Sequence, residues 1–159
     1  MAVGLACDDV GDSLTLDEYF AEMETILYDS FDDFDSFKSD WDERRASAGD
    51  LTDKELLELD RGETLAQLAA YNHTVSRVRE LEPPPEASAA HGAYLQAITE
   101  IDDLFSNFVS SEEHTDQGFD QESEIFIEAS DRWFSTCTVL IEIAEANDVD
   151  AQPCGFPSR

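Results

Sequence analysis

The chain has 159 residues, of which 38 are acidic and nine are basic, so its net charge is −29. Hydrophobic residues make up 42% of it, which is enough for one domain with a buried core. So large a negative charge disfavours direct binding to nucleic acid or to an anionic membrane surface, and it favours cations and basic protein surfaces. No apolar run approaches the roughly 20 residues that a membrane-spanning helix needs.

A run of three prolines, Pro83, Pro84 and Pro85, divides the chain near its midpoint. No helix can continue through it, because three backbone donors are lost and each preceding residue is pushed out of helical geometry. Each half has the pattern of a helical hairpin, so we expect an all-α, antiparallel up-down-up-down four-helix bundle. We place a flexible acidic leader at 1–13, the bundle at 14–147, and a non-helical tail at 148–159 that packs back on the bundle.

Two similar start signals mark the helices of the first hairpin. Thr15 with Glu18, and Thr52 with Glu55, have the spacing of a capping box. The first helix is expected to end just before Gly49, which would be its left-handed cap, and the second to end at the prolines. The predicted seam of the first helix is Leu16, Phe20, Met23, Leu27, Phe34, Phe37 and Trp41. That of the second is Leu57, Thr64, Leu68, Tyr71, Val75 and Val78.

The second hairpin is predicted from the same periodicity. The third helix should hold Pro84 or Pro85 in its first turn, where a missing donor is harmless. The fourth should run from near Asp120 to about Asn147; its β-branched stretch 135–143 has no second strand to pair with, so we assign it to the helix. The predicted seams are Ala87, His91, Tyr94, Ile98, Ile101, Phe105 and Phe108, followed by Phe126, Ala129, Trp133, Cys137, Leu140 and Ala144.

The cysteines allow one disulfide between the last helix and the tail. Cys137 lies about ten residues, or roughly 15 Å, before the expected helix end, and the chain up to Cys154 is long enough to fold back over that distance. We therefore predict a Cys137–Cys154 disulfide; the alternative is a buried free Cys137 and an unpaired Cys154. Cys7 could be lipid-modified, paired between chains, or a free thiol.

The first residues resemble the end of a secretory signal. Small residues at Gly4 and Ala6 would suit cleavage before Cys7. We therefore expect an exported protein that is extracytoplasmic, either secreted or anchored to a membrane through its N-terminus. The alternative is an ordinary N-terminal segment.

The densest acidic stretch, 29–43, offers five candidate ligands for calcium or another divalent cation: Asp29, Asp32, Asp33, Asp35 and Asp40. An EF-hand loop does not fit, because the position of the turn glycine is not filled. The alternative interpretation is a solvated outer face of a helix whose aromatic side chains point inward.

No pattern in the chain indicates catalysis. There is no phosphate-binding loop, no nucleophile elbow and no Cys-x-x-Cys, so we expect neither an enzyme nor a resident cofactor. His91 falls on the apolar seam of the third helix, and we interpret it as a structural histidine that bonds a carbonyl of the proline corner.

The segment from Pro83 to His91, and Cys137 followed by the sequence of residues 150–155, resemble uncharacterised exported or lipoprotein-like helical-bundle proteins of bacteria. The resemblance covers most of residues 14–156 and implies no particular activity. We expect a non-enzymatic, extracytoplasmic interaction or structural protein that binds another protein, which could be basic, or a second copy of itself. The alternatives are a divalent-cation-binding protein and a nucleic-acid mimic that occupies a basic partner.

Overall fold

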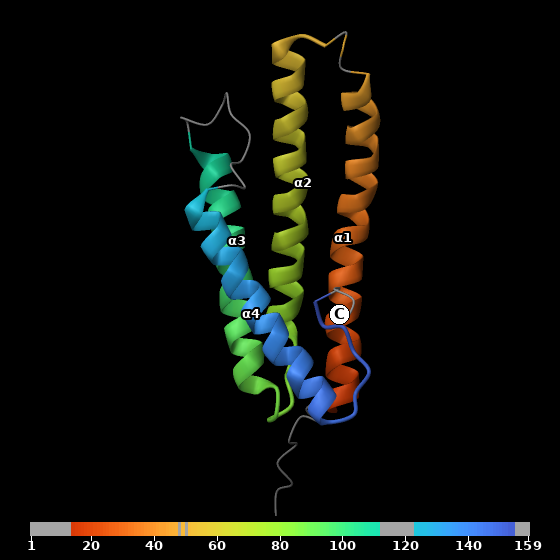
Figure 1. Cartoon of the computed structure of the whole chain (residues 1–159), viewed down its shortest axis with the longest axis vertical. Coiled ribbons are helices and arrows are strands. Elements are labelled where there is room, and N and C mark those ends of the chain that lie inside the picture. The colour runs from red at the N-terminus through yellow and green to blue at the C-terminus, as the bar shows by residue number, and fades with distance from the viewer. Residues whose placement is uncertain (1–13, 48, 50, 112–122, 155–159) are drawn as a thin grey trace, which may run out of the picture.

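The computed structural model describes residues 14–47, 49, 51–111 and 123–154, and this part of the chain contains four helices (Figure 1). They are α1 (Leu16–Ala46), α2 (Asp53–Glu80), α3 (Ser88–Ser110) and α4 (Glu124–Ala146). Each helix packs on the next, α1 on α2, α2 on α3 and α3 on α4, and successive helices run in opposite directions. The all-α four-helix bundle is thereby confirmed.

Both predicted capping boxes are present. The Glu18 carboxylate accepts the Thr15 backbone N–H at 2.9 Å, and the Glu55 carboxylate accepts the Thr52 backbone N–H at 2.8 Å. The bond from the backbone of Thr15 lowers the pKa of Glu18, and the bond from the hydroxyl of Thr52 lowers the pKa of Glu55. Helix α4 is capped by Ser123, whose hydroxyl accepts a backbone N–H of the first turn.

The left-handed cap lies at a different helix from the one predicted. Gly49 is not left-handed, and α1 already ends with Ser47 as its cap, so that prediction was wrong. The left-handed residue is Asp148, with a φ of 57°, just after α4. It lets the Val149 N–H reach the Ala144 carbonyl at 2.9 Å, a Schellman arrangement that turns the chain sharply back.

The prolines lie before the third helix and not inside its first turn. A separate turn, closed by the Ala87 N–H and the Pro84 carbonyl at 3.0 Å, precedes α3, which begins at Ser88. The prediction that Pro84 or Pro85 occupies the first turn was therefore wrong. The restriction that proline places on the residue before it explains why regular helical geometry begins only after the run.

The core lies where all four helices overlap. In α1 the buried side chains run from Tyr19 to Ser30, and in α2 from Thr64 to Val78, while α3 and α4 are buried along most of their predicted seams. Phe108 and Phe126 are half-buried, and the side chain of Phe37 lies outside the described part. The largest completely buried side chains include Tyr19, Phe20, Met23, Tyr94, Ile98, Ile101, Phe105 and Leu140.

Helices α1 and α2 extend past the ends of α3 and α4 (Figure 1). They have 31 and 28 residues, whereas α3 and α4 have 23 each. We call the extension, residues 34–47 of α1 and 51–63 of α2, the arm. None of its described side chains is fully buried. The opposite end, where α1 begins, α4 ends and the prolines turn the chain, is the base.

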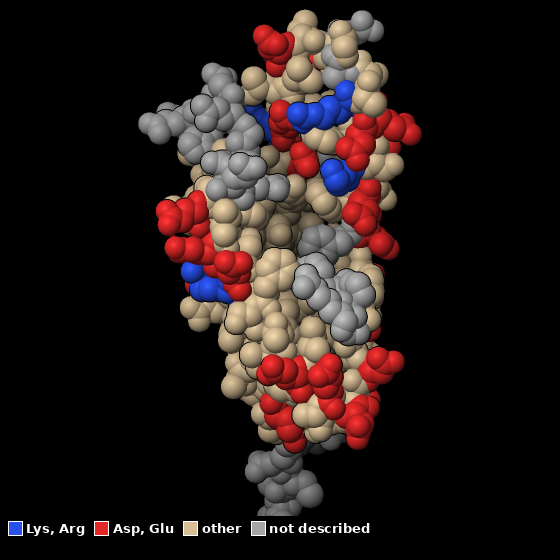
Figure 2. Space-filling model, in the orientation of Figure 1, with Lys and Arg blue, Asp and Glu red and all other residues tan. Residues whose placement is uncertain are grey.

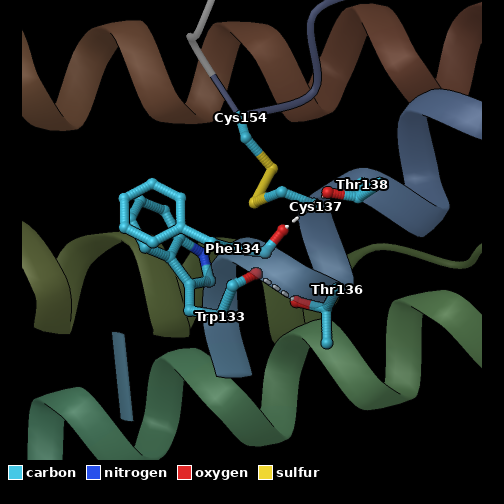
Figure 3. Close-up of a disulfide and its surroundings, with 6 residues drawn as sticks. All are labelled: Trp133, Phe134, Thr136, Cys137, Thr138 and Cys154. Atoms are coloured by element: carbon cyan, nitrogen blue, oxygen red, sulfur yellow. Dashed lines mark hydrogen bonds between the residues drawn. A yellow bond between two sulfur atoms is a disulfide. The ribbon is translucent and has the colours of Figure 1, made fainter. Parts of the chain in front are cut away.

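The chain after α4, which we call the strap (residues 149–154), folds back over the base. Cys154 is joined to Cys137 of α4 with their Cα atoms 5.8 Å apart, and both are almost fully buried (Figure 3). The Gln152 N–H donates to the carboxylate of Glu24 on α1. The predicted disulfide is thus present, and the strap links α4 to α1; residues 155–159 of the predicted tail lie outside the described part.

Reducing the disulfide should loosen the strap and lower the stability of the bundle. A closed loop of this length limits the unfolded chain, so its loss should cost about 3 kcal/mol. Denaturant unfolding of the protein with and without a thiol reductant measures this cost. In a Cys137→Ala/Cys154→Ala variant the reductant should have no effect; an equal effect there would mean that it acts elsewhere.

Candidate interaction site

The described surface divides into a strongly acidic base and a charge-mixed arm. Figure 2 shows most of the Lys and Arg side chains of this face over the arm, one basic group at mid-height on the left, and only acidic charges at the base. Residues 34–63 contain five of the nine bases and ten of the 38 acids. The remainder of the chain contains 28 acids and four bases.

Trp41 is the central side chain of the arm. Lys38 and Arg45, on the same helix, both lie over its indole ring, at 5.1 Å and 4.7 Å from the ring centroid. Each such cation–π contact contributes about 0.5–1 kcal/mol at an exposed site. Arg45 also reaches Asp60 of α2 at 2.8 Å, so the same guanidinium fixes the indole and connects the two helices of the arm.

Beside Trp41, a groove of about 520 Å³ runs between α1 and α2. Its apolar wall includes Leu51 and Leu59, which are half-buried. Charged residues of both signs complete the lining: Asp40, Arg44, Glu55 and Glu58. Tryptophan and arginine are enriched among residues that dominate protein–protein interfaces, and Trp41 and Arg44 both line this groove.

Exposed apolar side chains also lie on both flanks of the buried seam of α4. Ile125 is 64% exposed, and Ile127, Phe134 and Val139 are between 43% and 47% exposed. Phe134 packs its ring against Trp133 at 5.2 Å between centroids, beside the disulfide (Figure 3). The sequence analysis missed these residues, because the helical pattern assigns α4 one buried seam and leaves its flanks undistinguished.

His91 is buried, as predicted, but its partner is different. Its Nδ1 lies 3.1 Å from the hydroxyl oxygen of Tyr19 on α1, 72 residues away, and no bond to a proline-corner carbonyl is seen among the described residues. The prediction of a carbonyl partner was wrong. Burial lowers the pKa of His91, which favours the neutral form of the ring in the folded chain.

The buried phenols near His91 are poorly suited to acid–base chemistry. Burial raises the pKa of Tyr71 to about 12 and raises those of Tyr19 and Tyr94 further. These groups stay protonated at neutral pH and cannot act as bases there. Tyr71 stacks on Phe105 at 5.3 Å between ring centroids, a contact that contributes to the packing of the core.

Acidification should destabilise the protein through His91. Because the folded chain lowers the pKa of this histidine, the unfolded chain binds protons more readily below about pH 6.5, and stability is lost as the pH falls. Denaturant unfolding at about pH 7.5 and about pH 5.5, at constant ionic strength, measures this loss.

The matched control is His91→Gln, whose amide can still bond the Tyr19 hydroxyl but does not titrate. The wild-type chain should lose more stability than this variant between the two pH values. Carboxylates contribute equally to both proteins, so identical losses would contradict a role for His91.

The predicted cation ligands whose side chains are described are spread along α1 and do not converge. Asp29 is exposed and lies 3.9 Å from Arg77, Asp32 and Asp35 are exposed, and Asp40 borders the groove of the arm. The side chain of Asp33 lies outside the described part, as does Cys7. Among the described residues no three potential ligands form a metal-binding group. The cation site therefore stays a prediction.

Calcium should stabilise the chain no more than screening does. From Asp29 to Asp40 the helix rises about 16 Å, so a single ion cannot bind all of these carboxylates. Thermal unfolding in millimolar calcium chloride and in sodium chloride of equal ionic strength should give equal midpoints. A higher midpoint in calcium alone would establish a cation site in the folded state.

No family model matches this chain, and comparisons with curated proteins and with solved structures find no similar protein. No helix within the described ranges is both long and apolar enough to cross a membrane.

Proposed function

We propose that this chain is a non-enzymatic interaction module that works outside the cytoplasm and binds a protein partner through its arm. The observation that carries the proposal is the arm itself, a two-helix extension in which Trp41 and several leucines remain half exposed. Two helices cannot enclose a core by themselves, and apolar surface left in water is a cost that a partner would remove.

The composition of the arm supports a protein as the partner. Tryptophan and arginine are the side chains most enriched among residues that dominate binding energy, and here Trp41 lies under Arg45 with Arg44 in the neighbouring groove. The stacking by Lys38 and Arg45 restricts the indole before binding, which lowers the entropy lost on association.

A location outside the cytoplasm is supported by the buried Cys137–Cys154 disulfide. Such bonds form and persist in oxidising compartments and are rare in a reducing cytosol. Attachment through a lipid on Cys7 would place the tether near the base, because α1 begins there. The arm, about 46 Å away at the other end of α1, would then point away from the membrane.

We also propose two alternative functions that would use the negative charge. The chain could bind divalent cations, or it could mimic nucleic acid and bind a basic protein. The cation hypothesis depends on the calcium measurement described above. A mimic would bind a basic protein tightly at low salt and release it at high salt, because its attraction would be electrostatic.

Site-specific photo-crosslinking in cells that make the chain tests the role of the arm. A crosslinker at Lys54, an 85% exposed side chain of the arm, should yield a discrete adduct with a protein. The same group at Glu142, an exposed position of α4 near the base, is the control and should yield none. Equal labelling from both positions, or no adduct from either, would contradict the proposal.

A further inference from the structure

The arm lies beyond the part of the first hairpin that the second hairpin covers. Below the arm, α3 packs on α2 and closes the core, and α4 packs on α3. In the arm no described residue is fully buried, and its described large apolar side chains are half-buried. They are Phe34, Trp41, Leu51, Leu56, Leu57 and Leu59. The hairpin of α3 and α4 thus covers the lower part of the hairpin of α1 and α2. The arm has no such cover among the described residues.

We propose that a second copy of this chain provides the cover, through pairing of two arms about a two-fold axis. This inference rests on the proposed function and names the partner. Two antiparallel hairpins placed face to face make a four-helix bundle, the arrangement already present in the lower half of the molecule. A two-fold axis presents the same surface from both copies, so the surface must be complementary to itself.

The charges of the arm meet that requirement. Among the described residues, Arg44 and Arg61 have no carboxylate partner, and Asp40 and Glu63 have no basic partner. On a second copy of the arm each of these arginines can meet an unpaired carboxylate. The arm has ten acids and five bases, whereas the remainder of the chain has 28 acids and only four bases and so offers far fewer such pairs.

The position of the arm also limits the electrostatic cost of pairing. Each copy has a net charge of −29, and its acidic base lies at the end opposite to the arm. Contact between the two arms keeps these ends as far apart as the fold allows, so their mutual repulsion is smallest. That repulsion is screened by salt, and therefore self-association should become stronger as salt rises.

The size of the arm predicts a weak dimer. About 14 residues per helix give a length of about 21 Å, and two helices side by side are about 20 Å wide. The resulting face of roughly 400 Å² per copy is small for a specific interface, which suits a transient complex with a dissociation constant in roughly the micromolar range.

Sedimentation velocity of the purified chain tests the proposal. Between about 5 µM and about 500 µM, the dimer fraction should rise with concentration, and it should be larger in about 2 M than in about 0.1 M sodium chloride. Arg44→Glu should weaken association at least about tenfold, because it places a carboxylate where the partner arm offers others. Arg77→Glu, outside the arm, changes the net charge equally and should associate like the wild type.

Circular dichroism of each variant checks that it is folded, and Arg61→Glu replaces Arg44→Glu if the latter is not. A chain that is monomeric at every concentration and salt, or equal association of the Arg44→Glu and Arg77→Glu variants, overturns the inference. If the chain is monomeric but the crosslinker at Lys54 captures a different protein, self-association fails while the proposed function stands. If the chain is monomeric and no adduct forms, both fail.

Discussion

Helices α1 and α2 exceed α3 and α4 by five to eight residues, and the burial pattern of the whole molecule depends on this difference in length. Where four helices overlap, side chains such as Met23 and Ile98 are completely buried. Where only two remain, Trp41 and Leu57 stay half exposed although they lie on the same apolar seams. The same kind of side chain therefore stabilises the core at one end and forms a candidate binding surface at the other.

Because the net charge is −29, the fold must be stabilised mainly by interactions that are not ionic. The ion pairs described are exposed, such as Lys54 with Glu58 at 3.7 Å and Arg132 with Glu100 at 2.8 Å. Pairs of this kind contribute about 0–1 kcal/mol each and weaken with salt. Apolar burial, the capping boxes and the disulfide must therefore offset the repulsion among the carboxylates.

Local signals made much of the fold predictable. Both capping boxes depend on residues three positions apart, and the seam of α3 follows from helical periodicity, so Thr15, Thr52 and Tyr94 could be placed from sequence. The disulfide was predictable because chain length limits what Cys154 can reach. Contacts between distant segments were not, as the bond between Tyr19 and His91 shows. The arm was not predictable either, because helical periodicity does not show which turns of one helix lie beside a neighbouring helix.

The disulfide also determines how the molecule would respond to mechanical tension. Because Cys154 is bonded to Cys137 in the middle of α4, a pull on the C-terminal side would be transmitted to the buried part of that helix. The last turns of α4 would bear no load. A pull on the N-terminal side would act on the first turn of α1, where the exposed bonds between Thr15 and Glu18 can open one after another. The two sides of the chain should therefore resist tension unequally.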